Sequence, residues 1–172
     1  MVATKRPPAI SGVSADKEAV IMTVYPSIAA AGPGRWLGSL YDSIPLKVGG
    51  IKLSHLLFVL PTAPLALAGY AQLKILGEVY TLTNRAVQKR ASIGNRLLSQ
   101  VPLASIAEVA LVQEAGQAFY PAADLYLLDK KGDTLTILRG VPRAEVFRQT
   151  ILEAMTARRH VEESLARINA RQ

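Results

Sequence analysis

The sequence predicts a mainly β protein that ends in a helix: a bent antiparallel sheet or partly open β-barrel, preceded by an apolar membrane helix or helical hairpin. Three observations support this fold class. Residues 53–73 contain no charged side chain. From residue 78 onward, short segments alternate between apolar and polar residues and are separated by turn residues, which is typical of strands. After Pro142, apolar residues recur at the spacing of one helical face.

The length and composition suit one domain with an unusually apolar surface. The chain has 172 residues, of which 50% are hydrophobic and 19% are charged. A typical soluble domain is less apolar and carries about 25% charged residues, so part of this apolar surplus is expected to face lipid. The chain has no cysteine, which excludes disulfides and thiolate metal sites.

The net charge of +7 is concentrated near the apolar segment. Residues 1–77 carry seven Lys or Arg against three acids (+4), residues 78–141 seven against six (+1), and residues 142–172 six against four (+2). A nucleic-acid-binding domain would concentrate its positive charge on its folded face. Positive charge beside an apolar segment is typical of a cytoplasmic membrane protein, where it contacts lipid headgroups. We therefore expect the lipid bilayer as a partner and no nucleic acid.

Two segments precede the apolar stretch. Residues 1–22 contain adjacent prolines and small polar residues without an apolar period, which predicts a disordered tail. Residues 23–50 are expected to form an interfacial or linker segment with a short amphipathic helix over residues 34–44. The apolar face of that helix consists of Trp36, Leu37, Leu40, Tyr41 and Ile44. Such a helix lies along the headgroups or, equally well by its pattern, packs on the β-domain.

Residues 51–77 form the predicted membrane segment. A helix over residues 53–73, at about 1.5 Å per residue, covers roughly the hydrocarbon thickness of a bilayer. Aromatic residues suited to membrane interfaces lie on both sides of it: Trp36, Tyr41, Tyr70 and Tyr80. The alternative is a buried helix of a soluble domain. A small β-domain with a docked helix of its own has little room for a second helix that is apolar all round.

Two prolines bracket the middle of this segment. Pro61 and Pro64 each remove a backbone donor and bend the chain. They predict either one kinked span or a shallow hairpin that turns at residues 61–64. Residues 32–52 hold three Lys or Arg, and residues 74–96 hold five. By the positive-inside rule a single span places the C-terminal domain in the cytoplasm, at the inner (plasma) membrane, and a hairpin is expected to do the same.

Residues 78–172 are predicted to form the β-domain with an extended C-terminal helix. Alternation and turn residues predict six strands: Glu78–Thr83, Ala86–Ile93, Arg96–Leu103, Ile106–Glu114, Asp124–Asp129 and Thr134–Val141. The turn between the last two strands contains Lys130-Lys131-Gly132-Asp133, which is a hairpin signal.

The C-terminal helix is expected to begin near Arg143, because Pro142 suits a first-turn position, and to continue into the 160s. Arg158 interrupts its apolar stripe. The first half of the stripe consists of Phe147, Ile151 and Met155, and the second half of Val161, Leu165 and Ile168. We expect the first half to dock on the sheet and the second half to meet a protein partner or a second copy of the chain.

The segment from about residue 78 to residue 155 resembles a known family. It begins with Tyr80-Thr81-Leu82-Thr83-Asn84-Arg85 and continues with a polar strand, Val101-Pro102-Leu103, two hairpin strands and a helix. This order resembles the bacterial pleckstrin-homology-like (PH-like) domain. The resemblance implies a seven-stranded barrel closed by a C-terminal helix, so a seventh strand is expected within residues 96–114. It also implies a β-domain that follows membrane segments directly, in a family whose members mostly have no known biochemical activity.

The sequence offers no catalytic set. The two histidines, His55 and His160, lie in different regions and share no acidic partner. The carboxylates are scattered over turns and helix surfaces. Gly32-Pro33-Gly34 lacks the preceding strand and following lysine of a phosphate-binding loop. We therefore predict a protein that is not an enzyme, with no catalytic residue, cofactor, metal or small-molecule substrate.

Four basic residues around the second predicted strand are candidates for lipid headgroup contact: Arg85, Lys89, Arg90 and Arg96. Each cation close to an anionic leaflet adds about 1 kcal/mol of attraction. Lipid-binding pleckstrin domains hold inositol phosphates between their first two strands, where this chain has only Arg85. Lys89 and Arg90 are adjacent, so they must point to opposite faces of a strand. The alternative is a solvated basic edge strand that discourages edge pairing.

The function expected from these features is that of a membrane-anchored, non-catalytic interaction or scaffold module of PH-like type. It binds a protein partner or a second copy of itself at the membrane surface. The alternative is a peripheral sensor of anionic lipid headgroups that acts through the basic strand edge.

Overall fold

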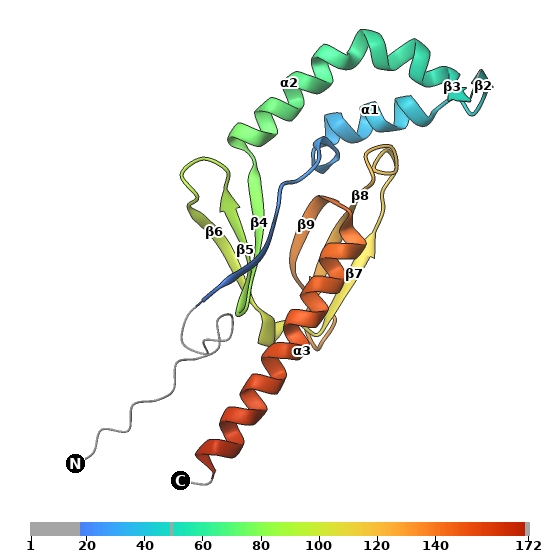
Figure 1. The fold of residues 1–172 in the computed structure, drawn as a ribbon. Helices are drawn as coiled ribbons and strands as arrows, with labels where there is room; N and C mark the ends of the chain where they lie inside the picture. The colour runs from blue at the N-terminus through green and yellow to red at the C-terminus, as the bar shows by residue number, and fades with distance from the viewer. Residues whose placement is uncertain (1–17, 49, 171–172) are drawn as a thin grey trace.

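The computed structural model describes residues 18–48 and 50–170 (Figure 1). Two antiparallel sheets and a long C-terminal helix form the body of the molecule, and two further helices cover one end of it. Most of the predicted N-terminal tail, residues 1–17, lies outside the described residues. The last residues of that predicted tail, from Val20 onward, belong to the first strand of the fold.

The first sheet has four strands in the order β1-β4-β5-β6. Three of them follow the predicted strands closely. The members of this sheet are β1 (Val20–Val24), β4 (Glu78–Thr83), β5 (Ala86–Ala91) and β6 (Leu97–Pro102). All neighbouring pairs are antiparallel.

The second sheet has three antiparallel strands in the order β7-β8-β9. Its members are β7 (Glu108–Val112), β8 (Ala122–Leu128) and β9 (Thr134–Pro142). A 3-10 turn, η3 (Leu103–Ser105), connects the two sheets. At the β8–β9 hairpin, the Asp129 carboxylate accepts hydrogen bonds from the backbone N–H groups of Lys131 and Asp133, as its turn sequence predicts.

The seventh strand lies before the apolar segment and not within residues 96–114, where it was expected. That stretch forms only β6, η3 and β7. Strand β1 instead supplies the edge of the first sheet, with Met22 opposite Leu82 and Val24 opposite Tyr80. Because β1 and β4 are neighbours in the sheet, residues 25–77 form an insertion within the β-fold and not a segment ahead of it.

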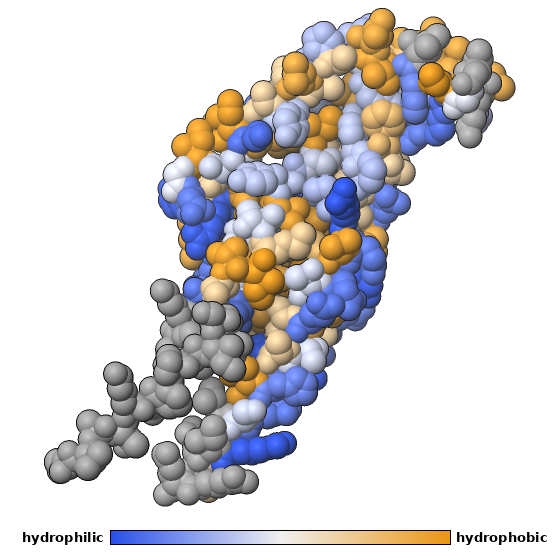
Figure 2. All heavy atoms as spheres, viewed as in Figure 1, coloured by the Kyte–Doolittle hydropathy of each residue, from blue (hydrophilic) through white to orange (hydrophobic). Residues whose placement is uncertain are grey.

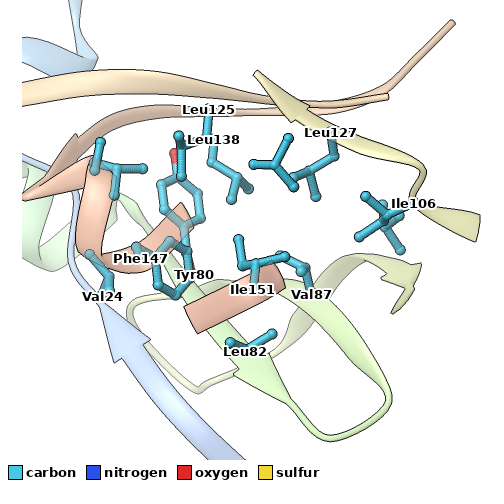
Figure 3. Packing of buried hydrophobic residues seen from close by; sticks show 14 of the residues in the cluster. Val24, Tyr80, Leu82, Val87, Ile106, Leu125, Leu127, Leu138, Phe147 and Ile151 are labelled. Carbon is cyan, nitrogen blue, oxygen red and sulfur yellow. The ribbon is translucent and has the colours of Figure 1, made fainter. Parts of the chain in front are cut away.

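The core lies between the two sheets and α3 (Ala144–Asn169). Figure 3 shows side chains from both sheets and from α3 pointing toward one another. The fully buried members include Leu82, Leu125, Leu127, Leu138, Phe147 and Ile151. Phe147 and Ile151 lie one helical turn apart on α3, so one face of its first half closes the core. No strand pairing between the two sheets is present in the described residues, so the sheets form an open arrangement and not a closed barrel.

Residues 25–77, hereafter the helical insertion, run from β1 to β4 and form two helices that lie side by side (Figure 1). The helices are joined by a short β-hairpin at the far end. In chain order its elements are η1 (Ile28–Ala30), α1 (Gly32–Asp42), β2 (Lys47–Val48), β3 (Ile51–Lys52), the π-helical turn η2 (His55–Val59) and α2 (Leu60–Leu76).

The chain does not turn back at residues 61–64, so the predicted hairpin at the two prolines is wrong. The helix continues through both prolines, and Figure 1 shows it curving over α1. Pro61 lies where the π-helical turn η2 passes directly into α2, and Pro64 lies inside α2. The hydroxyl of Thr62 donates to the carbonyl oxygen of Phe58 at 2.5 Å, which satisfies a backbone acceptor near the bend. The chain reverses instead at the β2–β3 hairpin, where Gly50 has φ +85°.

Candidate functional site

Helix α2 exposes an apolar surface that the rest of the chain does not cover. Its residues all fall within the described part of the chain, and none of them is buried. Leu57–Leu76 is the one described helix whose length and composition would allow it to cross a membrane. Hydrophobic residues cover the outer surface of this helix in Figure 2. Exposed large side chains on it include Leu60, Leu65, Leu67, Tyr70, Ile75 and Leu76. An apolar patch of this extent is typical of a contact surface.

Helix α1, the counterpart of the predicted helix over residues 34–44, docks on the β-domain. Its Leu37 and Tyr41 are buried, whereas Trp36 is 62% exposed. A Cβ atom on Gly38 would lie 2.1 Å from the carbonyl oxygen of Gly116, in the loop between β7 and β8. The two backbones therefore touch directly, and any larger residue at either glycine would separate them. Beside this contact, Arg35 forms an ion pair with Glu114.

An aromatic cluster holds the two helices of the insertion to the same loop. The ring of Phe119 lies 4.7 Å from that of Tyr41, 5.2 Å from that of His55 and 4.9 Å from that of Tyr120, centroid to centroid. The Tyr41 hydroxyl lies 2.5 Å from the Thr62 hydroxyl on α2. Burial raises the pKa of Tyr120 to about 12. These contacts fix the N-terminal half of α2 to the end of the β-domain.

The start of the insertion is tied to β9 by backbone contacts. The N–H group of Ser27 donates to the carbonyl oxygen of Gly140 at 2.8 Å. Gly140 has φ +60°, and a Cβ atom there would lie 2.4 Å from the nitrogen of Ala30. The buried carboxylate of Asp124 accepts the N–H group of Gly140 at 2.7 Å and the amide of Gln117 at 2.5 Å. One polar network therefore connects β8, β9 and the β7–β8 loop, on which α1 docks.

A groove of about 520 Å³ separates α1 from the C-terminal half of α2. Small residues leave this space open, and its walls are almost entirely apolar. Its lining residues include Ala31, Trp36, Ala66, Ala68, Leu73 and Gly77. A recess of about 220 Å³ shares Ala31, Leu73 and Gly77 with the groove, and it adds the polar side chains of Glu78, Tyr80 and Arg139.

The four predicted headgroup residues do not form one strip. Strand β5 lies between β4 and β6, so it is an internal strand and not the predicted edge. Lys89 lies on the face of Val87 and Tyr80, which points into the core, and Arg90 lies on the opposite face, where its guanidinium donates to the side-chain oxygen of Gln88 at 2.7 Å. Arg85 and Arg96 lie in the turns at opposite ends of β5. Only the end near Arg96 adjoins the helical insertion, because the N–H group of Ser92 donates to the carbonyl oxygen of Gly77.

The histidines remain separate in the fold. His55 packs edge-on against Phe119, so it is part of the aromatic cluster. His160 is exposed on the distal part of α3, with Glu163 at 3.8 Å. In residues 18–48 and 50–170, no group of three or more His, Asp or Glu side chains is placed to hold a metal ion.

The predicted partner residues lie on the distal half of α3. Ala154 is the last buried residue of this helix among those whose side chains are described. Val161 is half-buried, and the helix continues through the positions of Leu165 and Ile168. The helix therefore extends well past its contact with the core (Figure 1).

The sequence did not predict the residues through which the helical insertion contacts the β-domain. They are Gly38, Gly116, Phe119, Tyr120 and Arg139. The glycines carry no periodic signal, since each is needed for one close approach between distant segments. Phe119 and Tyr120 stand in a stretch that looked like an ordinary loop. Adjacent aromatics in a loop were the one usable signal, because such side chains need a surface to pack on.

A model of a protein family described as a bacterial PH domain matches residues 27–155 of the chain. The matched region starts shortly after β1, includes every helix and strand of the helical insertion and ends within α3. No curated protein and no solved structure matches the sequence.

Proposed function

Because this chain belongs to the bacterial PH domain family, we propose that it is a non-catalytic interaction module held at a membrane surface by its helical insertion. The family supports a non-catalytic module in general. The observation that carries the membrane part of the proposal is the exposure of α2. This helix is as apolar as a core helix, yet none of its residues is buried. In water such a surface would be strongly unfavourable.

The pairing of β1 with β4 supports a path that returns to the side from which it came. The strand before the insertion and the strand after it share backbone hydrogen bonds along Met22–Val24. A single crossing would place these strands on opposite sides of the bilayer and break that pairing. The docking of α1 on the β7–β8 loop also holds α2 close to the β-domain. In our proposal, α2 therefore lies in the interface with its outer face among the acyl chains.

The proposed location is the cytoplasmic face of the inner (plasma) membrane. Lys74, at the last turn of α2, lies next to the end of the first sheet that carries Arg90 and Arg96. Cations beside an apolar surface are favoured near the anionic cytoplasmic leaflet. In this arrangement the distal half of α3, with Val161, Leu165 and Ile168, extends away from the core and is free to contact a protein partner or a second copy.

Flotation of the full chain with vesicles of phosphatidylglycerol and phosphatidylethanolamine tests the proposal. A variant with Leu60→Ser, Leu67→Ser and Ile75→Ser removes three exposed side chains from α2 and should lose most of its vesicle binding. The matched control replaces three exposed leucines of the β-domain, Leu97, Leu98 and Leu135, by serine. It should float as the unaltered chain does.

Thermal unfolding of both variants establishes that they remain folded. Because the α2 side chains are exposed, neither variant should lose much stability. Equal flotation of the two variants, or a full chain that stays in solution without vesicles and does not float, would refute the membrane part of the proposal.

A further inference from the structure

The apolar groove between α1 and α2 leads into a recess that is lined by charged side chains. The two together match a ligand that has one apolar part and one charged part. The groove is apolar and measures about 520 Å³, within the range of roughly 300–1,000 Å³ that is usual for ligand sites. At the C-terminal end of α2 it meets the recess through the shared residues Ala31, Leu73 and Gly77. A molecule with an apolar tail and a polar head would span both without a break.

The recess presents an exposed cationic side chain, Arg139. Arg139 lines it and is exposed, while its backbone N–H group and carbonyl bond to the Tyr80 hydroxyl at 3.0 and 3.2 Å. The guanidinium is therefore not needed to hold β9 to Tyr80. Lys89 is the register partner of Tyr80 on β5 and lies on the same face of the sheet. Lys89 does not line the recess, whereas one acid, Glu78, lines it together with Arg139. The exposed guanidinium of Arg139 is the group available to an anionic head.

Lys89 supports this description of the recess. Burial lowers the pKa of its ammonium group, Glu78 opposes this effect, and Arg139 adds to it. A cation held in a partly desolvated position beside a second cation gains from an anionic ligand.

We propose that the groove binds one acyl chain of an anionic membrane phospholipid, with the lipid phosphate in the recess beside Arg139 and Lys89. This inference rests on the proposed membrane attachment, and it adds a single defined lipid site. A second copy of the chain is the other possible occupant of an apolar groove. The lipid fits better because the apolar walls continue into a recess with an exposed arginine, and because α2 is already the surface that would lie among acyl chains.

Trp36 provides a direct probe, since it lines the groove and is the single tryptophan of the chain. The full chain in mixed micelles of a non-ionic detergent is titrated with phosphatidylglycerol brominated on its acyl chain, and Trp36 fluorescence is recorded. The proposal predicts quenching that saturates at one lipid per chain. Brominated phosphatidylcholine should bind more weakly.

Two matched substitutions on α2 separate the groove from the general apolar surface. Ala66→Phe fills the groove and should weaken saturable quenching about tenfold or more, a loss of about 1.4 kcal/mol for each factor of ten. Ala71→Phe adds the same ring at an exposed position that does not line the groove and should leave quenching unchanged. Ala68→Leu is a smaller filling substitution that serves if Ala66→Phe fails to fold.

A charge substitution tests the recess. Arg139→Gln keeps the backbone bonds to Tyr80 and should reduce the preference for phosphatidylglycerol over phosphatidylcholine about fivefold. Arg159→Gln, on the distal part of α3, removes an equal charge elsewhere and should leave the preference unchanged.

Three outcomes would overturn the inference. One is quenching that rises in proportion to the lipid fraction and is the same in Ala66→Phe, since Trp36 would then sample only bulk lipid. Another is an unchanged lipid preference in Arg139→Gln. The third is absent quenching together with a dimer that Ala66→Phe converts to a monomer, which would assign the groove to a second copy. Normal flotation in any of these cases leaves the membrane attachment intact, whereas failed flotation refutes that attachment itself.

Discussion

Gly38 on α1 and Gly116 in the β7–β8 loop lie with their backbones in contact: a Cβ atom on the first would come within 2.1 Å of the carbonyl oxygen of the second. This contact determines where the helical insertion sits. Movement of α1 away from the loop would break this contact. The contact therefore holds α2 in a fixed position across one end of the β-domain.

Substitution of these glycines should therefore destabilise the fold. Gly38→Ala forces the helix away from the loop, and we expect a loss of about 1–3 kcal/mol in the free energy of unfolding. Gly116→Ala should cost more, because Gly116 also has φ +82°. Gly69→Ala is the control: a Cβ atom there meets nothing within 4 Å, and alanine in a helix interior should stabilise the chain slightly. Chemical denaturation of the three variants measures these effects, and an unaffected Gly38→Ala would contradict the docking contact.

Tyr80 and Tyr120 should respond differently to loss of the hydroxyl. The Tyr80 hydroxyl exchanges hydrogen bonds with the backbone of Arg139, so Tyr80→Phe should lower the free energy of unfolding by about 1 kcal/mol or more. The Tyr120 hydroxyl oxygen is buried and has no hydrogen-bond partner in the described residues. Tyr120→Phe should therefore leave stability unchanged or raise it. Equal losses in the two variants would be evidence against this assignment.

The same tyrosines predict a loss of stability at alkaline pH. Burial raises the pKa of Tyr120 from its ordinary value of 10 to about 12, and burial also raises the pKa of Tyr80. Between the two values the unfolded chain loses the phenol proton while the folded chain keeps it. The contribution is therefore complete below pH 10 and is lost as the pH rises through the folded pKa. Denaturation at stepped pH should show this decline, and Tyr120→Phe should make it shallower. A stability that does not fall above pH 10 would contradict the prediction.

The hydrogen bonds of the buried Asp124 carboxylate should be required to hold the helical insertion on the β-domain. Asp124→Leu removes the carboxylate that accepts hydrogen bonds from the Gln117 amide and the Gly140 N–H group. Both buried donors then lack this acceptor. We expect a loss of at least about 2 kcal/mol in the free energy of unfolding. Asp133→Leu, at an exposed turn position, should cost much less. A similar loss in free energy of unfolding in both variants would show that the buried hydrogen bonds of Asp124 do not stabilise the fold more than an exposed turn residue does.

The sequence predicts the β-domain well because its strands carry a local signal. The six strands from residue 78 onward and the start of α3 lie within a few residues of their predicted positions. Their alternation and turn residues depend only on neighbours in the chain. Strand β1 is different: its partner β4 lies beyond the whole insertion, so no local pattern links the two. That long separation is why the seventh strand was expected in the wrong place.

The site was less predictable, because it depends on contacts between distant segments. Proximity in sequence suggested one basic cluster at Arg85, Lys89, Arg90 and Arg96. In the fold, Lys89 and Arg90 lie on opposite faces of β5, and Arg85 and Arg96 lie at its opposite ends. Arg139, which lies in the recess, is far from them in sequence. Similarly, Pro61 and Pro64 suggested a turn that the chain makes at the β2–β3 hairpin instead. Such errors follow from reading spacing along the chain as distance in the fold.

Site-specific labelling tests the central claim, that the insertion attaches the chain to one face of a membrane, most directly. The chain has no cysteine, so single cysteines can be placed after β1 (Tyr25→Cys), in the β-domain (Ser105→Cys) and on the outer face of α2 (Leu67→Cys). Each full-length variant is bound to preformed vesicles and treated from outside with a membrane-impermeant maleimide. We predict rapid labelling at Tyr25→Cys and Ser105→Cys, and protection at Leu67→Cys until detergent is added. Labelling of only one of the first two positions, or equally rapid labelling at Leu67→Cys, would contradict the claim.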